Sequence, residues 1–278
     1  MQALLPSAPF LLALSGVFYL GAFVCALGRF ARQGVLFHTF WVLGFCVQGA
    51  GLFLTGVAAH ALPLSGAFEI LQAITWCAVA MALLLRVFYR VRALGFFVTG
   101  LAVLLCALSW LLPRHGESTP SFFAGEPLLG LHVILGILAY GLFVLAALAG
   151  FLYLLQNAAL RGKRGGGLSR LLPSLKTLEG IQLFLVPLGL GVLALSLLLG
   201  IFYWADLPEF RQLDFLKLLL TACVWMGFLL LYIFKRLGKL SALMFARGIL
   251  AVCLLALASI WTLGGSARVA EPPPHSQS

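Results

Sequence analysis

Histidines near the ends of apolar segments are the residues in this sequence best suited to chemistry. Of the five histidines, His60, His115, His132 and His275 fall on one side of the predicted spans described below, and His38 lies near the other. Neutral imidazole is a common ligand of metals and of haem iron, and two imidazoles can hold haem from opposite faces. Because loops carry polar residues in any membrane protein, this distribution makes the histidines candidate ligands without assigning the role.

His132 lies two residues into the apolar stretch GLHVILGILAYGLF. On a helix, Gly136 falls one turn and Tyr140 about two turns further along the same face. A small residue beside an imidazole leaves room for a flat group, which favours His132 and Tyr140 as cofactor-binding residues. The same pattern is typical of close helix packing, with the imidazole hydrogen-bonded to a backbone carbonyl. Both interpretations stay open at the level of sequence.

The segment HALPLSGAFEILQAITW, which starts at His60, is a second candidate. Pro63 and Gly66 predict a turn, and Glu69 falls in the first turn of the helix that follows, where the helix dipole favours an anion. Glu69 could orient His60, pair with a cation, or cap the helix, and capping is the interpretation that we favour.

The segment FYWADLPEFRQLDFLK, residues 202–217, combines aromatic, acidic and basic side chains. Tyr203 and Trp204 are typical of the aromatic belt at a membrane interface. Aromatic rings on the same side as several histidines could also line a site for a planar macrocycle.

The elements that position these residues are membrane spans. The chain of 278 residues is 63% hydrophobic and 9% charged, far from the composition of soluble domains. A spanning helix needs about 20 apolar residues. Eight stretches qualify: Pro9–Leu27, Val35–Ala58, Phe68–Val87, Leu94–Leu112, Leu129–Leu155, Ile181–Tyr203, Phe215–Phe234 and Gly248–Leu263. We therefore predict an all-α polytopic membrane protein, a bundle of about eight transmembrane helices.

The charged residues predict the orientation of these spans. Most of the 18 lysines and arginines lie in alternate connections, and the opposite side carries nearly all of the 8 acidic residues. Basic loops face the cytoplasm, so both termini are expected on the outer (periplasmic) side. The net charge of +10 is thus a topology signal, and we expect no nucleic-acid partner. One transmembrane domain is predicted over 1–266, followed by a disordered tail over 267–278.

The remaining polar and cysteine residues give few signs of other chemistry. The sequence has no acid or base at mid-depth in a span and no inverted repeat with broken helices, which disfavours a small-solute transporter. The six cysteines all lie in apolar runs without a CxxC motif, so we expect them to be buried small hydrophobic residues.

The order of several short motifs resembles the cytochrome c assembly family of integral membrane proteins, the CcsA/ResC type, and most closely its short HemX-like members. The family loop G-H-x-P-L-S-N-x-Y-E corresponds to HALPLSGAFE from His60, and Y-R-x-R-A-L-G corresponds to Tyr89–Gly95. A span that begins H-V and has tyrosine seven positions after the valine matches His132 to Tyr140. The linker R-L-L-P-S-L-x-x-L-E at Arg170–Glu179 resembles the HemX-like branch. The resemblance covers roughly residues 55–265.

For the haem-handling members, the resemblance implies two outer histidines that ligate haem b on a tryptophan-rich loop. His132 matches the first ligand by position, and Asp214 matches the aspartate that closes the loop. Pro63 and Glu69 match the earlier motif.

This chain also departs from that pattern. Its outer loop keeps only Trp204, the sequence near 264–268 is GGSAR without a histidine, and Phe234 stands where the family has another histidine. His275 lies in a flexible tail, so His60 is the favoured second ligand. The scaffold and one ligand are kept, whereas the complete haem platform is not.

Three functions follow as hypotheses. The resemblance implies first a non-enzymatic factor of the bacterial cytoplasmic membrane that presents haem for c-type cytochrome biogenesis, with other assembly proteins and apocytochrome c as partners. The alternative is a HemX-like membrane regulator of haem (tetrapyrrole) biosynthesis whose partner is a biosynthetic enzyme. A small-solute transporter is the third hypothesis and the one that the sequence supports least.

Overall fold

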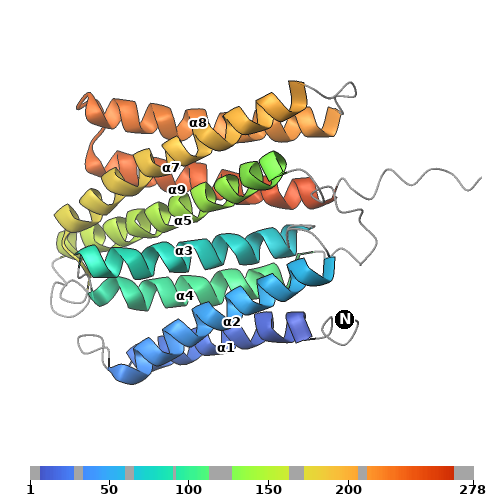
Figure 1. The fold of residues 1–278 in the computed structure, drawn as a ribbon. Coiled ribbons are helices and arrows are strands. Elements are labelled where there is room, and N and C mark those ends of the chain that lie inside the picture. The colour runs from blue at the N-terminus through green and yellow to red at the C-terminus, as the bar shows by residue number, and fades with distance from the viewer. Residues whose placement is uncertain are drawn as a thin grey trace, which may run out of the picture.

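The computed structural model describes residues 7–27, 34–59, 66–89, 92–112, 127–162, 172–205 and 212–265. Over these ranges every long element is an α-helix and no strand occurs. The helices lie side by side along one common direction, and helices that follow one another in the chain alternate in direction (Figure 1). They are α1 (Ser7–Leu27), α2 (Val35–Ala59), α3 (Ala67–Tyr89), α4 (Arg92–Ser109), α5 (Pro127–Arg161), α7 (Leu175–Ala205), α8 (Gln212–Arg236) and α9 (Ala242–Gly265).

These helices confirm the predicted all-α membrane bundle. Each of the eight predicted spans overlaps one of them. Helices α1, α2, α3, α5, α7 and α8 are long and apolar enough to cross a membrane, and the described apolar stretches of α4 and α9 are shorter. Helix is the expected state, because a bilayer offers the backbone no water and a helix satisfies its peptide groups internally.

The helix ends extend beyond the predicted spans on the basic side of the bundle. Helix α5 continues to Arg161, past the predicted end at Leu155, and α7 begins at Leu175 instead of Ile181. Hydropathy marks the hydrocarbon boundary, whereas a helix continues until its backbone is capped. Each predicted span is therefore confirmed as a helix, and six of these helices are long and apolar enough to cross a membrane. Three boundaries were wrong by one to two turns, because α9 also begins earlier than predicted, at Ala242 instead of Gly248.

Helix α5 is the central helix of the bundle and packs against α3, α7 and α9 (Figure 1). Residues 141–150 of α5 are all buried. Glycines allow the close approach: a methyl group at Gly141 would lie 2.8 Å from Cβ of Cys77 on α3, and one at Gly150 would lie 3.1 Å from the carbonyl oxygen of Ala246 on α9. The two halves of the chain are thus joined along α5.

The start of α1 and the end of α9 lie at the same end of the bundle (Figure 1). The starts of α3, α5 and α8 and the ends of α2, α4 and α7 lie there too, so we call it the His132 end. The opposite end is the basic end, where Arg161, Lys235 and Arg236 terminate α5 and α8. That the His132 end faces outward stays a prediction from the charges, and so does the extent of the single domain. The tail 267–278 lies outside the described residues.

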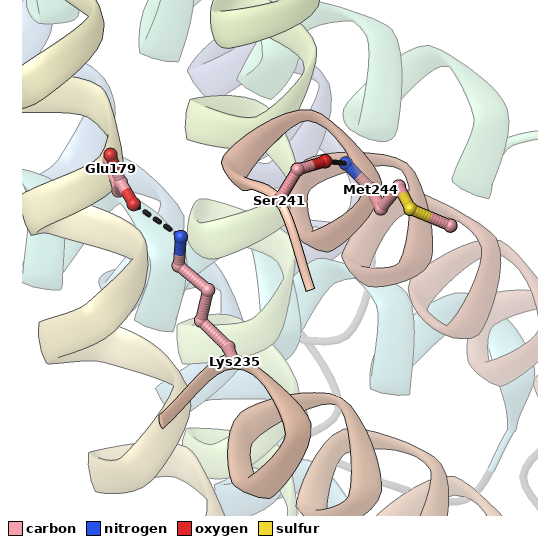
Figure 2. A network of polar contacts seen from close by, with 4 residues as sticks. All are labelled: Glu179, Lys235, Ser241 and Met244. Atoms are coloured by element: carbon pink, nitrogen blue, oxygen red, sulfur yellow. Dashed lines mark hydrogen bonds and ion pairs between the residues drawn. The ribbon is translucent and has the colours of Figure 1, made fainter. Parts of the chain in front are cut away.

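Residues 174–179, which belong to the linker segment at Arg170–Glu179, form the N-terminal cap and the first turn of α7. The backbone N–H of Thr177 donates to Oγ of Ser174 (3.2 Å), which makes Ser174 the N-cap. Leu178 is fully buried. Oε1 of Glu179 lies 2.6 Å from Nζ of Lys235 on α8 (Figure 2). The motif therefore caps α7 and ties it to α8 at the basic end.

The α8–α9 connection at the basic end is a tight turn that is closed by hydrogen bonds and a glycine with positive φ. Gly238 has φ of +71°, which favours glycine. The N–H of Lys239 donates to the carbonyl of Phe234 (3.0 Å), and the N–H of Gly238 to that of Lys235 (3.1 Å), as in a Schellman motif. The hydroxyl of Ser241 then accepts from the N–H of Met244 (3.2 Å) and caps α9 (Figure 2).

A chain of buried polar side chains crosses the N-terminal half of the bundle. The hydroxyl of Tyr19 on α1 donates to Oε1 of Gln48 on α2 (2.8 Å), and Nε2 of Gln48 donates to Oε1 of Gln72 on α3 (2.7 Å). Nε2 of Gln72 donates to Oγ of Ser109 on α4 (2.9 Å). All four side chains are fully buried, so this polar chain binds four helices together inside the membrane.

Candidate functional site

His132 lies in the second turn of α5, at the His132 end of the bundle, and is half-buried. Helix α5 begins at Pro127, a residue suited to the first helical position because its fixed φ fits the helix and its missing N–H would be unsatisfied there. Within the following turn the helix turns His132 toward α7. The side chain thus sits between two packed helices.

His132 and Ser196 of α7 make reciprocal hydrogen bonds. Nδ1 of His132 lies 2.6 Å from the backbone carbonyl oxygen of Ser196, and the Ser196 hydroxyl donates to the carbonyl oxygen of His132 (2.7 Å). Oγ of Ser196 is also 3.1 Å from Nδ1. Ser196 is buried. We call this arrangement the His132–Ser196 clasp, and it joins the start of α5 to the last third of α7.

The clasp determines which ring nitrogen carries the proton in neutral His132. A carbonyl oxygen only accepts, so Nδ1 must be the N–H donor, and Nε2 then carries the lone pair. Histidine ligands of metals characteristically donate their other ring N–H to a carbonyl or carboxylate, which fixes the ring and its tautomer. The His132 imidazole therefore has the hydrogen bonding of a positioned Nε2 ligand.

Two glycines shape the space around the clasp. A methyl group at Gly200, one turn after Ser196, would lie 2.8 Å from Cε1 and 3.0 Å from Nδ1 of His132. A methyl group at Gly136 would lie 3.4 Å from Oγ of Ser196. The ring of His132 is thus packed directly on the α7 backbone at Gly200.

Only some of the predicted site residues lie on the two helices that form the His132–Ser196 clasp, α5 and α7. Trp204 follows Gly200 by four residues in α7, so its backbone continues the stripe of Ser196 and Gly200 toward the helix end. Tyr140 lies eight residues after His132, about 12 Å along the helix axis, and its hydroxyl is hydrogen-bonded to Thr221 of α8. Tyr140 therefore links α5 to α8 at a deeper level.

The other predicted residues are divided between α3, α8 and segments outside the described residues. Glu69 is buried in the first turn of α3, in the other half of the bundle. Asp214 belongs to the first turn of α8. His60 and Pro63 lie outside the described residues, as do the side chains of Trp204 and Asp214. These roles stay predictions.

The cysteine prediction was wrong for two of six residues. Cys106 and Cys253 are buried, whereas Cys46 and Cys223 are exposed on α2 and α8, and all six are free thiols. An apolar run places a cysteine in the membrane, but which face of the helix it occupies decides between core and lipid. Among the described residues, no three or more His, Cys, Asp or Glu side chains gather as a metal site.

The sequence alone did not indicate Ser196 and Gly200 as site residues. Their signal is S-x-x-x-G in the sixth predicted span, a small-residue pair one helical turn apart that favours close helix approach. The motif does not show which helix packs against it. The pairing of Ser196 with His132, 64 residues earlier in the chain, is therefore visible only in the structure.

Two known proteins resemble this chain along most of its length. Over 194 residues, 70% of each chain, it is 31% identical to Protein HemX of Brevibacillus brevis. The chain belongs to the HemX family. It is also 28% identical to Protein HemX of Bacillus subtilis (strain 168) over 198 residues, 69% of each chain. No family model and no solved structure matches it.

Membership of the HemX family refines the predicted resemblance. The HemX-like branch is supported, whereas assignment to the CcsA/ResC type itself is not. The chain is thus a multi-pass membrane protein of the HemX family.

Proposed function

We propose that this protein is a non-enzymatic membrane factor of haem biosynthesis that regulates the pathway through a protein partner. The observation that carries the proposal is the shared family with HemX proteins over 70% of the chain, because the resemblance implies this role for the HemX-like branch. The 202–217 segment has a single tryptophan, which also supports this proposal. For the haem-handling members of the cytochrome c assembly family, the resemblance implies a tryptophan-rich loop that presents haem, and this chain does not have such a loop at that position.

The partner in this proposal is a soluble enzyme of the pathway that meets the basic end of the bundle. Among the described residues, that end carries exposed cations on α5, α7, α8, the α8–α9 turn and α9, and the capped turn presents Lys239. The exposed cations are Arg161, Lys176, Arg236, Lys239 and Arg247. In the bacterial cytoplasmic membrane, with this end inward, these cations would face the cytoplasm, where the enzyme is soluble.

Deleting the gene in its own host tests this proposal. We expect altered levels of haem precursors, measured by extraction and chromatography, and normal c-type cytochromes, measured by haem staining. Expression of the full-length chain should restore the precursor levels. Loss of c-type cytochromes with unchanged precursors would instead support haem delivery together with cytochrome c assembly partners and apocytochrome c.

A second candidate function, haem binding at His132, has its own supporting observation. The imidazole is held by a carbonyl on Nδ1, the arrangement that fits an axial ligand of haem iron through Nε2. Bound haem would supply an iron atom and a planar ring. The chain itself would hold that ring at the interface between α5 and α7, so that the protein would respond to the presence of haem. Such binding is compatible with regulation, because the end product of the pathway would be the signal.

His132→Ala tests the second candidate. Full-length protein purified in detergent and supplied with haemin should show a Soret band with wild-type His132 and lose it, or shift it strongly, in the variant. Phe234→Ala serves as the control. Phe234 lies at the basic end of α8, away from the His132 end, so this variant should leave the Soret band unchanged. An identical band in all three proteins would exclude His132 as a ligand.

A further inference from the structure

We propose that Ser196 and Gly200 are positioning residues that hold His132 as an Nδ1–H tautomer and so direct Nε2 toward a metalloporphyrin. This inference rests on the second proposed function and assigns the residues that make it specific. Both lie on α7, 64 and 68 positions after the histidine.

Several contacts with one residue, Ser196, fix the position of the His132 imidazole. Nδ1 lies 2.6 Å from the carbonyl oxygen and 3.1 Å from the hydroxyl of Ser196. The same hydroxyl donates to the backbone carbonyl of His132 (2.7 Å). One acceptor would be enough to satisfy the Nδ1–H group of a histidine. Here the backbone and the ring of His132 are both tied to the same residue.

The α7 backbone at Gly200 packs directly against the ring of His132. A methyl group at Gly200 would be 2.8 Å from Cε1 and 3.5 Å from Nε2 of His132. The first distance is well inside van der Waals contact, so any side chain at this position would displace the imidazole from the Ser196 carbonyl. Glycine at position 200 is therefore what permits the ring orientation.

The His132–Ser196 clasp lies near one end of the bundle. Gly200 is five residues before the end of α7 at Ala205, and His132 is five residues after the start of α5 at Pro127. Both helix ends meet at the His132 end (Figure 1). A planar ligand at the interface reaches this place without crossing the hydrophobic core, whereas a residue with a purely structural role is equally useful at any depth.

The tautomer can be measured without any ligand. In full-length protein with ¹⁵N-labelled histidines in lipid nanodiscs, the His132 signals are assigned by their loss in His132→Gln. We expect Nδ1 to carry the proton in the wild type. Gly200→Ala should mix the tautomers or shift them to Nε2–H, because the methyl group moves the ring off the carbonyl.

The affinity for haemin is measured in the same proteins by titration of the Soret band. Loss of a residue that orients a metal ligand typically weakens metal affinity 10–100-fold, so we expect about a tenfold weaker binding in Gly200→Ala and in Ser196→Ala. Ser196→Ala removes only a hydroxyl group and keeps the result interpretable where Gly200→Ala does not fold.

Matched controls separate positioning from general damage. Gly191→Ala changes the same helix at a position where a methyl group meets nothing within 4 Å. Ser15→Ala removes another buried hydroxyl, which donates to the carbonyl of Leu12 in its own helix (2.7 Å). Both controls should keep the wild-type tautomer and haemin affinity.

The outcomes distinguish this inference from the proposed haem binding. An Nε2–H tautomer in the wild type, or a tautomer and affinity unchanged in both α7 variants, overturns the positioning role even where haem binds. The expected tautomer pattern without any haemin binding overturns haem as the ligand and with it the second proposed function. The expected tautomers together with weakened binding in the two α7 variants support the inference.

Discussion

At the scale of the residue, single hydrogen bonds and single methyl groups change the stability of a packed membrane protein. A polar side chain in an apolar environment costs free energy unless it is bonded. His132 meets that requirement at Nδ1 through the carbonyl of Ser196, and this bond offsets the cost of removing the N–H group from water. Its presence therefore needs no ligand to explain it energetically. The specific shape of the clasp, with glycine behind the ring, is what points to a function.

Gly44→Ala tests the tight packing of single residues in the N-terminal half. A methyl group at Gly44 on α2 would lie 2.8 Å from two ring carbons of Tyr19 on α1. Overpacking of this kind typically costs about 1–3 kcal/mol, and Tyr19 cannot yield easily because its hydroxyl is bonded to Gln48. We expect a lower midpoint in thermal unfolding of the detergent-solubilised protein. Gly180→Ala, where a methyl group meets nothing within 4 Å, is the control and should be neutral or stabilising; equal loss in both variants would contradict the argument.

At the scale of the element, the prediction of helices from sequence succeeded where the signal is local. Spans such as Val35–Ala58 follow from apolar length alone, and α2 ends within one residue of that boundary. The partners of a helix are not local information. The bond from Tyr140 to Thr221 and the clasp of His132 with Ser196 both join residues that only the packing of α5 against its neighbours brings together.

The polar chain across α1 to α4 predicts that Gln48→Leu destabilises the protein. The substitution leaves the Tyr19 hydroxyl and the Gln72 amide without their bonds to Gln48. Hydrogen bonds between membrane helices are each worth about 0.6–2 kcal/mol, so we expect a loss of about 1–3 kcal/mol in unfolding titrations with a denaturing detergent.

The double variant Gln48→Leu/Gln72→Leu makes the interpretation specific. Removing both partners of a buried hydrogen bond costs less than leaving one of them without a partner. Gln72→Leu should therefore lower the free energy of unfolding less in the Gln48→Leu background than in the wild type. Strictly additive losses would mean that the two amides are not energetically coupled.

At the scale of the whole molecule, the sequence predicted the helices that the structure describes, and their alternating direction, better than the site that they build. Alternation of basic connections gives an even number of spans, and the bundle places the start of α1 and the end of α9 together (Figure 1). The candidate site was predicted only at His132. Its partners Ser196 and Gly200 belong to a helix whose own pattern indicates only that something packs closely against it.

The orientation of the molecule in the membrane is the last prediction. The basic end carries the Glu179–Lys235 ion pair and the exposed Lys239, whereas Leu111 is exposed just after α4 at the His132 end. In a variant without native cysteines, we introduce Lys239→Cys or Leu111→Cys and treat whole cells with a membrane-impermeant maleimide. Because basic loops are retained in the cytoplasm, position 111 should be labelled in intact cells and position 239 only after lysis. The reverse pattern would place the His132 site in the cytoplasm and would remove the basic end as the surface that meets a soluble enzyme.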